Sequence, residues 1–158
     1  MLSEKVVEKI NKEAAKYPTK RAVVKSALRY AQQERGWVDD TVVNDVAEIL
    51  DLEPIQVMEV ATFYDLFYTQ PVGRHQLRVC TNVSCMLCGS DDVVSYLRDK
   101  LGVRSGETTA DGRFTLFEVE CLGACGGAPM MMVGDRYYEN LSPGRIDQIL
   151  EELEPADE

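Results

Sequence analysis

Four of the five cysteines form two spaced pairs, and this spacing constrains the chain more than any other feature of its sequence. Cys80 and Cys85 enclose a C-x4-C loop, and Cys121 and Cys125 enclose a C-x3-C loop about one supersecondary unit later. Four thiolates arranged as two pairs are typical of a metal site. Because His75 is the only histidine, a site with two histidines on one iron, as in Rieske centres, cannot be built here. Any iron-sulfur cluster must be ligated by cysteine alone.

Four interpretations of these thiols remain open. Structural zinc usually binds tighter C-x2-C loops, although its spacing varies. Structural disulfides need an oxidising compartment, whereas Met1 to Asn11 is charged and has no signal-peptide core. Cys85 and Cys88 form a C-x-x-C motif that can serve as a thioredoxin-like dithiol, but this leaves the other three cysteines unexplained. An iron-sulfur cluster uses four of the five, so the spacing favours it.

The ligand register has one competitor. Cys80, Cys85 and Cys88 also read as C-x4-C-x2-C, the first part of the plant-type ferredoxin pattern, and spacing alone does not exclude it. The second pair argues against it, because the small residues around Cys121 and Cys125 let backbone N–H groups approach sulfur closely. We therefore expect Cys88 to be a small buried hydrophobe or a spare thiol beside the site.

Length and charge limit the remaining classes. A chain of 158 residues is long enough for one core, or for a small domain with a helical extension, without needing a metal to fold. Its formal net charge of -10 opposes nucleic-acid binding, in which neutralised phosphates supply much of the affinity. No apolar run approaches the roughly 20 residues of a membrane span, so we expect no direct membrane insertion.

The pattern before Pro71-Val72-Gly73 is helical. Apolar residues recur at helical spacing in three runs, namely Val6, Val7, Ile10 and Ala14, then Val23, Val24, Ala27, Leu28 and Ala31, then Val42, Val43, Val46, Ile49 and Leu50. Pro18-Thr19 begins a second helix, Gly36 ends it, one of residues 39–41 caps a third, and Glu53-Pro54 opens a fourth. This predicts a small bundle over residues 1–72. The aromatic-rich segment 61–68 is expected either to join the bundle to the next domain or to bind a partner.

Residues 73–158 alternate between strand and helix patterns. We expect strands at 76–81 and 114–120, a helix from the Ser90-Asp91-Asp92 cap to about Gly102, and a hairpin through Gly134-Asp135. A last helix starts at Ser142-Pro143 and runs to Leu153, and acidic residues 154–158 read as a frayed tail. The predicted order is βαββα. Both cysteine loops then follow carboxyl ends of strands, which would bring the pairs together if those strands are parallel neighbours.

The chain resembles the small thioredoxin-like 2Fe-2S subunits of respiratory NADH:quinone oxidoreductase, complex I. The similarity covers nearly the whole chain. It is most specific at Cys80-Thr81-Asn82-Val83-Ser84-Cys85 and at Cys121-Leu122-Gly123-Ala124-Cys125 with Ala128-Pro129, and it includes Val60 to Tyr64, Pro71-Val72-Gly73 and Asp111 to Thr115.

The resemblance implies an α+β fold, in which a helical bundle precedes a thioredoxin-like domain carrying one 2Fe-2S cluster. It implies that Cys80, Cys85, Cys121 and Cys125 are the ligands, one pair per iron, and that Cys88 is outside the motif. It also implies a partner, the larger flavoprotein subunit that binds NADH and FMN, and a position on the cytoplasmic side, in the peripheral arm of a membrane-bound complex. The sequence agrees with this dependence, because no G-x-G-x-x-G or phosphate loop is present.

The expected chemistry is one-electron transfer in an oxidoreductase subunit that has no complete active site of its own. Single-electron centres near a flavin let the flavin, once reduced by hydride, be reoxidised in separate steps. A 2Fe-2S core with four thiolates carries a net charge of about -2 oxidised and about -3 reduced, and an acidic protein further disfavours reduction. We expect a potential on the order of -400 mV, moderated by N–H donors and burial.

Two alternatives from other classes remain. The same module resembles small subunits of NAD-linked hydrogenases and formate dehydrogenases, which share the local chemistry but have another final acceptor. A free-standing thioredoxin-like ferredoxin or dithiol protein is the second, and the helical half argues against it because a soluble carrier needs no such extension.

Overall fold

The computed structural model describes residues 1–153, in two compact units, Met1–Pro71 and the residues from Val72 onward. The fold is α+β, as predicted, with helices in the first unit and a mixed sheet with helices in the second. The division falls beside the boundary predicted between residues 72 and 73. That each unit is an independent domain stays a prediction. The predicted acidic tail at 154–158 lies outside the described residues.

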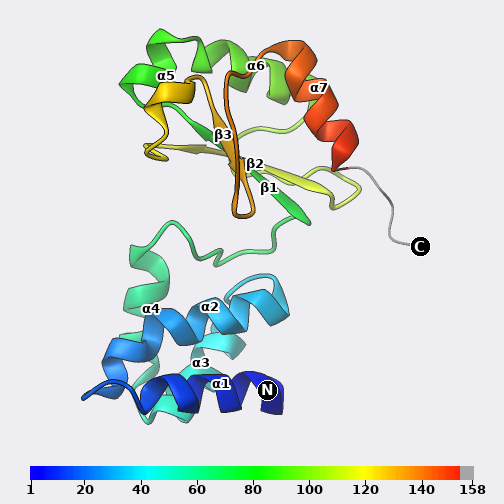
Figure 1. The fold of residues 1–158 in the computed structure, drawn as a ribbon. Helices are drawn as coiled ribbons and strands as arrows, with labels where there is room; N and C mark the ends of the chain where they lie inside the picture. The colour runs from blue at the N-terminus through cyan, green and yellow to red at the C-terminus, as the bar shows by residue number, and fades with distance from the viewer. Residues whose placement is uncertain (154–158) are drawn as a thin grey trace. The chain divides into compact units, whose positions relative to one another are not determined.

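The first unit contains the predicted helices. They are α1 (Glu4–Ala14), the 3-10 turn η1 (Lys20–Val23), α2 (Val24–Arg35), α3 (Asp40–Leu50) and α4 (Pro54–Phe63), and Figure 1 labels the α-helices among them. The second predicted helix begins as η1, with Thr19 as its N-cap, before it continues as α2. The apolar runs at helical spacing form one core in which Ile10, Leu28 and Val46 are fully buried. This burial explains the helices, because packing of an amphipathic face supplies most of their stability.

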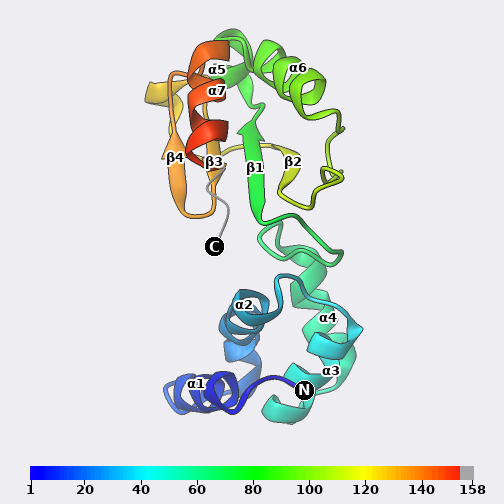
Figure 2. The same ribbon diagram turned by 90° about the vertical axis from the view of Figure 1, so that its right-hand side faces the viewer.

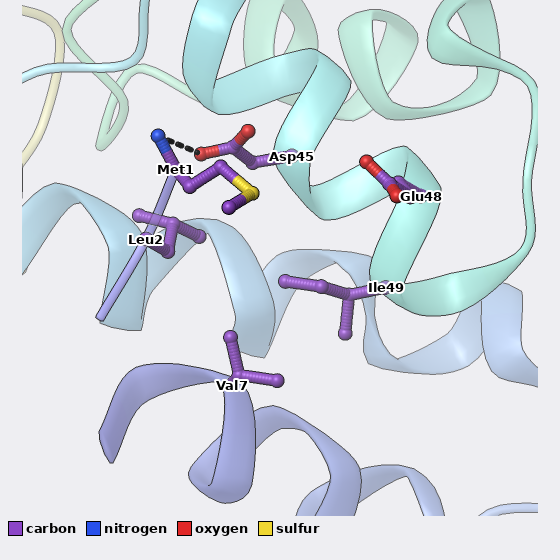
Figure 3. A pocket seen from close by; sticks show the side chains of 6 residues that line it. All are labelled: Met1, Leu2, Val7, Asp45, Glu48 and Ile49. Carbon is purple, nitrogen blue, oxygen red and sulfur yellow. Dashed lines mark ion pairs between the residues drawn. The ribbon is translucent and has the colours of Figure 1, made fainter. Parts of the chain in front are cut away.

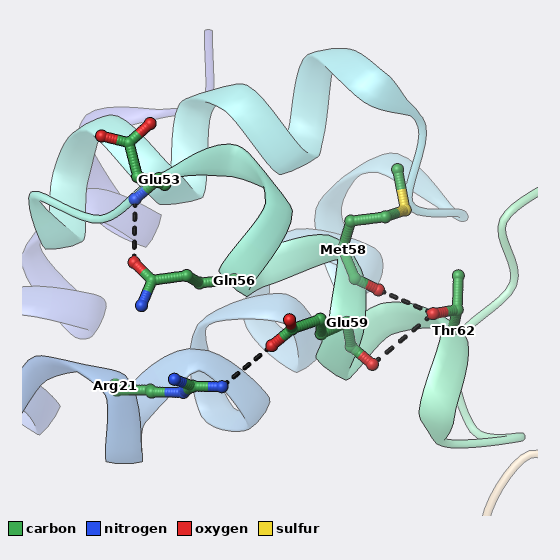
Figure 4. A network of polar contacts seen from close by, with 6 residues as sticks. All are labelled: Arg21, Glu53, Gln56, Met58, Glu59 and Thr62. Carbon is green, nitrogen blue, oxygen red and sulfur yellow. Dashed lines mark hydrogen bonds and ion pairs between the residues drawn. The ribbon is translucent and has the colours of Figure 1, made fainter.

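Local capping follows the sequence closely. The Asp39 carboxylate accepts a hydrogen bond from the N–H of Val42 at 2.8 Å, and Gly36 ends α2 with a φ of 89°. At the start of α4, the N–H of Glu53 donates to Oε1 of Gln56 at 3.1 Å, as Figure 4 shows. Each bond satisfies a backbone group that the ends of a helix otherwise leave unpaired.

The aromatic segment divides into buried and exposed parts. Because α4 ends at Phe63, the residues that follow continue without helical structure, and Phe67 turns back into the bundle core with 6 % of its surface exposed. Phe63 is 76 % exposed and packs edge-on against Tyr64, with ring centroids 4.9 Å apart. The segment is therefore part core and part open surface.

The second unit holds the sheet and its helices. Its elements are β1 (His75–Cys80), α5 (Val83–Leu87), α6 (Ser90–Leu101), β2 (Phe114–Val119), the 3-10 turn η2 (Cys125–Gly127), β3 (Met131–Val133), β4 (Arg136–Tyr138) and α7 (Pro143–Glu152). The predicted order βαββα has one strand fewer than the structure. The strand-helix-strand unit and the hairpin each contribute two strands, which makes four. The short helix α5 was not predicted, since five residues are too few to show a helical period.

The sheet has the strand order β2-β1-β3-β4, which Figure 2 shows. β1 and β2 are parallel, whereas β3 is antiparallel to both β1 and β4. The hairpin closes with Val133 opposite Arg136, so its turn is Gly134-Asp135, as predicted. This topology decides which loops meet at each edge of the sheet.

Helices α6 and α7 cover one face of this sheet. Leu77 of β1, Leu97 of α6 and Ile149 of α7 belong to one fully buried core, and Figure 1 shows both helices on the same side of the strands. Across their contact, Nζ of Lys100 and the hydroxyl of Tyr96 both donate to Oδ1 of Asp147, at 2.6 and 2.8 Å.

The predicted cap of α6 is wrong. The N-cap is Gly89, which has a φ of 95°, and the hydroxyl of Ser90 makes no capping bond. Ser90 is completely buried, and its hydroxyl oxygen has no hydrogen-bond partner among the described residues. The tight reversal between α5 and α6 needs a left-handed residue, so the glycine takes the cap position that the Ser-Asp-Asp sequence suggested for serine. The predicted cap of α7 is correct, since Oγ of Ser142 accepts from the N–H of Arg145 at 3.4 Å.

Candidate metal centre

The parallel pairing of β1 and β2 brings the two cysteine loops to one edge of the sheet. Cys80 is the last residue of β1 and lies in register with Val119, the last residue of β2, so Cys121 follows two residues beyond that edge. The prediction that both loops follow carboxyl ends of neighbouring parallel strands is confirmed. The strand-helix-strand unit therefore brings the two thiol pairs together.

Helix α5 positions the second thiol of the first loop. The Asn82 side chain accepts a hydrogen bond from the N–H of Val83 at 2.9 Å and starts the helix. Cys85 faces inward with only 1 % of its surface exposed, and it packs with Cys80 and the fully buried Met130. An asparagine two residues after the end of the strand was the signal that sequence reasoning missed.

The second loop is open and rich in glycine. Cys121 and Cys125 are both exposed, in contrast to the buried first pair. Gly123 has a φ of 74°, a left-handed conformation that other residues rarely adopt. The loop then continues into η2 and packs back on the sheet, where the N–H of Cys80 donates to the carbonyl of Met130 at 3.1 Å. One thiol pair is thus enclosed by the protein, and the other faces solvent.

The environment of the Cys80 thiol favours its charged form. Burial by itself raises the pKa of Cys80, but hydrogen bonds from the backbone N–H groups of Asn82 and Leu122 and from the thiols of Cys85 and Cys121 outweigh it and hold the pKa below its usual value. The Leu122 donor crosses from the second loop to a sulfur of the first, so it ties the two loops together. Cys80 Sγ also lies 3.7 Å from the Glu120 carbonyl oxygen, to which the protonated thiol can donate.

Cys85 has the opposite tendency. Burial, followed by its hydrogen bond with Cys80, raises the pKa of Cys85 to about 11, although the N–H of Met130 opposes the shift. The charges of Cys80 and Cys125 contribute to the increase, so three of the predicted ligands act on one another. A metal that binds the thiolates supplies the positive charge needed to overcome this repulsion.

These contacts fit the predicted cofactor. Cys80 is hydrogen-bonded to Cys85 within its own loop and to Cys121 in the other, and the charge of Cys125 reaches Cys85. Within residues 1–153, no three His, Cys, Asp or Glu side chains surround one point as a single metal ion would require. A 2Fe-2S cluster has two irons and takes a pair of thiolates at each, so the pairs need not meet at one point. The donors to sulfur are the backbone groups that such clusters use.

Cys88 and His75 lie outside this group of thiols. Cys88 follows α5 and is exposed, so the expectation of a buried hydrophobe is wrong, whereas a spare thiol agrees with its position. It lines a cavity of about 210 Å³ together with Tyr96 and Ile146, between α6 and α7. His75 is at the opposite end of β1 from Cys80, roughly 16 Å away at the usual strand rise, with its ring 5.6 Å from that of Phe114.

A second cavity, of about 290 Å³, lies in the helical unit between α1 and α3, as Figure 3 shows. It is lined by Leu2, Val7 and Ile49 and by the carboxylates of Asp45 and Glu48. The amino group of Met1 pairs with Asp45 at 3.4 Å. The two carboxylates repel phosphate groups and the aliphatic wall offers them no hydrogen-bond donor, so this cavity does not suit a dinucleotide.

A sheet that presents two thiol pairs at one edge, with backbone donors aimed at sulfur, defines a small iron-sulfur protein. Comparison with known families agrees: residues 10–154 match the family described as thioredoxin-like 2Fe-2S ferredoxin. The chain therefore belongs to the thioredoxin-like 2Fe-2S ferredoxin family, and its cofactor is a 2Fe-2S cluster.

Two relatives extend the similarity over nearly the whole chain. The chain is 51 % identical over 150 residues to an NADH-quinone oxidoreductase subunit from Rhizobium meliloti, covering 95 % of this chain and 89 % of that protein. It is 40 % identical over 151 residues to an NADH-quinone oxidoreductase subunit from Pseudomonas aeruginosa, covering 96 % and 91 %.

A solved structure is also similar. The fold matches a chain of an NAD+-reducing NiFe hydrogenase in the air-oxidised state with a TM-score of 0.70 and 25 % identity. The match covers 80 % of this chain but only 22 % of the hydrogenase chain. In the part of the chain that the structure describes, no helix is both long and apolar enough to cross a membrane.

Proposed function

We propose that this chain is the 2Fe-2S electron-transfer subunit of an NADH:quinone oxidoreductase, and that Cys80, Cys85, Cys121 and Cys125 ligate its cluster, one pair per iron. The observation that carries the proposal is the meeting of both thiol pairs at the edge formed by β1 and β2. The identity of 51 % across 95 % of the chain to a subunit of that enzyme supports the same assignment.

The cluster, when bound, takes up and releases one electron at a time. The residues of this chain hold it, shield it and stabilise its negative charge. Backbone N–H groups of Asn82 and Leu122 donate to Cys80, and that of Met130 donates to Cys85. Because these donors are fixed by the fold, no reorganisation is needed when charge is added. Met130 is fully buried beside both sulfurs and excludes water from the inner side.

We propose that the partner is the larger flavoprotein subunit, which binds NADH and FMN, and that it docks beside the cluster. Helix α5 carries Cys85 on its buried side, while its outer side exposes Val83, Met86 and Leu87, at 58, 49 and 78 %. Three large apolar side chains on five residues are unusual for a free surface. Their place next to the proposed ligands fits an interface that brings a flavin within electron-transfer distance.

Helix α4 offers a second contact surface. Six of its ten residues are large apolar residues or alanine, and they are spread around the whole circumference of the helix. Only Val57 and Ala61 among them are buried. Ile55 and Phe63 are 64 and 76 % exposed. A helix that is apolar all round is normally buried on every side. Among its polar contacts, Arg21 pairs with Glu59 at 2.8 Å on one flank of the helix, as Figure 4 shows.

The second candidate function is the equivalent subunit of an NAD-linked hydrogenase or formate dehydrogenase. The structural match to the NAD+-reducing hydrogenase, with a TM-score of 0.70, favours it. Identity of 25 % to that chain, against 40 to 51 % to the NADH-quinone oxidoreductase subunits, favours the quinone enzyme more strongly. We propose that the chain lies in the peripheral arm on the cytoplasmic side of such a complex, and that residues 1–72 and 73–158 are its two domains.

Anaerobic purification of the full chain tests the cofactor and its dependence on a partner. We expect a red-brown protein with about two irons and two sulfides, and an S = 1/2 EPR signal after dithionite. NADH alone should leave the visible spectrum unchanged, and adding the flavoprotein subunit should bleach it. Stoichiometric zinc would overturn the cofactor assignment, and bleaching by NADH alone would overturn the dependent-subunit assignment. Subunits that co-purify with the native chain decide between the quinone enzyme and the hydrogenase.

A further inference from the structure

The hairpin returns an acidic residue to the cysteine edge of the sheet. β3 runs away from that edge, from Met131 opposite Val79 to Val133 opposite Leu77, and β4 runs back, with Tyr138 opposite Met131. Glu139 directly follows β4, so it lies at the same edge as Cys80. Asp135, in the hairpin turn, lies at the other edge.

The Glu139 side chain packs against Gly127 at the end of η2, directly after the second cysteine loop. A Cβ placed on Gly127 would overlap Oε1, Cδ and Cβ of Glu139, so the carboxylate and its stem lie against the Gly127 backbone. The N–H of Asn140 donates to the Gly127 carbonyl at 2.7 Å and fixes this arrangement. Only a residue without a side chain at 127 leaves room for the carboxylate here.

This contact puts the carboxylate close to a proposed ligand. Gly127 is two residues from Cys125, and two peptide units span at most about 7.6 Å. With the carboxylate in van der Waals contact with Gly127, its distance from the Cys125 Cα is at most about 12 Å.

The Glu139 carboxylate forms no ion pair within residues 1–153. The cation nearest in sequence, Arg136, lies over the Tyr138 ring with its guanidinium carbon 4.9 Å from the centroid. The Arg136 guanidinium is thus engaged with the Tyr138 ring and forms no ion pair with Glu139.

We infer that Glu139 places a negative charge beside the cluster held by the neighbouring cysteines and thereby lowers the reduction potential of that cluster. The inference rests on the proposed ligand set. Reduction by one electron adds one negative charge beside the second loop. A carboxylate within about 12 Å of the Cys125 Cα opposes that charge through Coulomb repulsion. Because Glu139 is exposed, water screens the repulsion, and the expected effect on the reduction equilibrium is about twofold to tenfold.

The test uses the full chain, purified anaerobically with its cluster and titrated against redox dyes at low ionic strength while the EPR signal is recorded. Glu139→Gln keeps the shape of the side chain and removes its charge, so its midpoint potential should rise by about 18 to 59 mV, the one-electron equivalent of twofold to tenfold. Asp135→Asn makes the same charge change about 13 Å farther along the strand and should shift the potential by less than half as much. Glu139→Asp, which keeps the charge, should stay near the wild-type value.

Three results would overturn the inference. The first is a shift in Glu139→Gln no larger than in Asp135→Asn. The second is a shift in Glu139→Asp as large as in Glu139→Gln, which would indicate packing rather than charge. The third is loss of the cluster from Glu139→Gln alone, which would assign the residue to holding the loop. Failure of the ligand assignment is distinguishable, because it would appear as missing iron and sulfide in the wild-type chain.

Discussion

The glycines of the second cysteine loop allow a prediction in which geometry alone decides the outcome. Gly123 has a φ of 74°, whereas Gly126, three residues later, is not in the left-handed region, and a Cβ on either residue meets nothing within 4 Å. A Cβ therefore causes no steric clash at either position, and the two positions differ only in backbone conformation. Gly123→Ala should cost about 1 to 2 kcal/mol, the strain of a left-handed residue with a Cβ. Gly126→Ala should be neutral or stabilising by up to about 1 kcal/mol, because alanine restricts the unfolded chain.

In the folded protein, this cost falls on the conformation that presents Cys121 and Cys125. A strain of about 1 to 2 kcal/mol reduces the population of the ligating loop by a factor of about 5 to 30. Iron release from the oxidised cluster to an excess of ferric chelator, followed by loss of visible absorption without oxygen, measures that population. We expect release from Gly123→Ala to be about tenfold faster than from Gly126→Ala, which should match the wild type. Equal rates for the two variants would show that the left-handed conformation is not needed for ligation and would refute the reasoning.

Individual contacts support three further predictions. Cys88→Ser should keep the cluster spectrum, whereas serine at any of the four proposed ligands should lose or change it; loss of iron from Cys88→Ser, with Cys121 or Cys125 dispensable, would favour the plant-type register. Ser142→Ala should lower the unfolding midpoint in urea by removing about 1 kcal/mol of capping, whereas Ser90→Ala should leave it unchanged or raise it, because the buried hydroxyl of Ser90 is unpaired. The Lys100 amine and the Tyr96 hydroxyl hold the pKa of Asp147 below its usual value. The carboxylate therefore contributes its full stability at any pH above the usual pKa, and this contribution is lost as the pH falls through the lowered pKa of the folded protein. The destabilisation by Asp147→Asn should therefore be constant from about pH 8 to about pH 5, and a difference that shrinks within this range would contradict the assignment.

The sequence was sufficient for features that short-range physics determines. Helical periodicity, a cap among residues 39–41, Glu53-Pro54 and Ser142-Pro143 predicted the helices of the first unit and the last helix of the second. The strand-helix-strand pattern placed both cysteine loops after carboxyl ends of strands, and it predicted that the loops meet if β1 and β2 are parallel neighbours, as they are. In each case, the information lies in neighbouring residues or in a single crossover.

Features that depend on tertiary context were missed or assigned incorrectly. The helix α5 is too short to have a period, and the α6 cap moved to Gly89 because the chain reverses tightly there. The exposure of Cys88 depends on the orientation of α5 and could not be read from a C-x-x-C spacing. The contact between Glu139 and Gly127 joins residues 12 positions apart through the hairpin register, so neither residue stands out in the sequence.

The unequal burial of the two thiol pairs bears on how electrons reach the cluster. Cys80 and Cys85 are 4 and 1 % exposed and are enclosed by this chain, whereas Cys121 and Cys125 face solvent. The exposed side offers an electron donor the shorter path, because Met130 and the residues packed with it cover the buried pair. We therefore propose that the flavoprotein docks over the exposed pair and the apolar side of α5, which would remove water from the open face of the cluster. Removal of water strengthens every charge interaction at that face, including the repulsion by Glu139. On this reasoning, the effect of Glu139→Gln on the midpoint potential should be larger in the assembled complex than in the isolated chain.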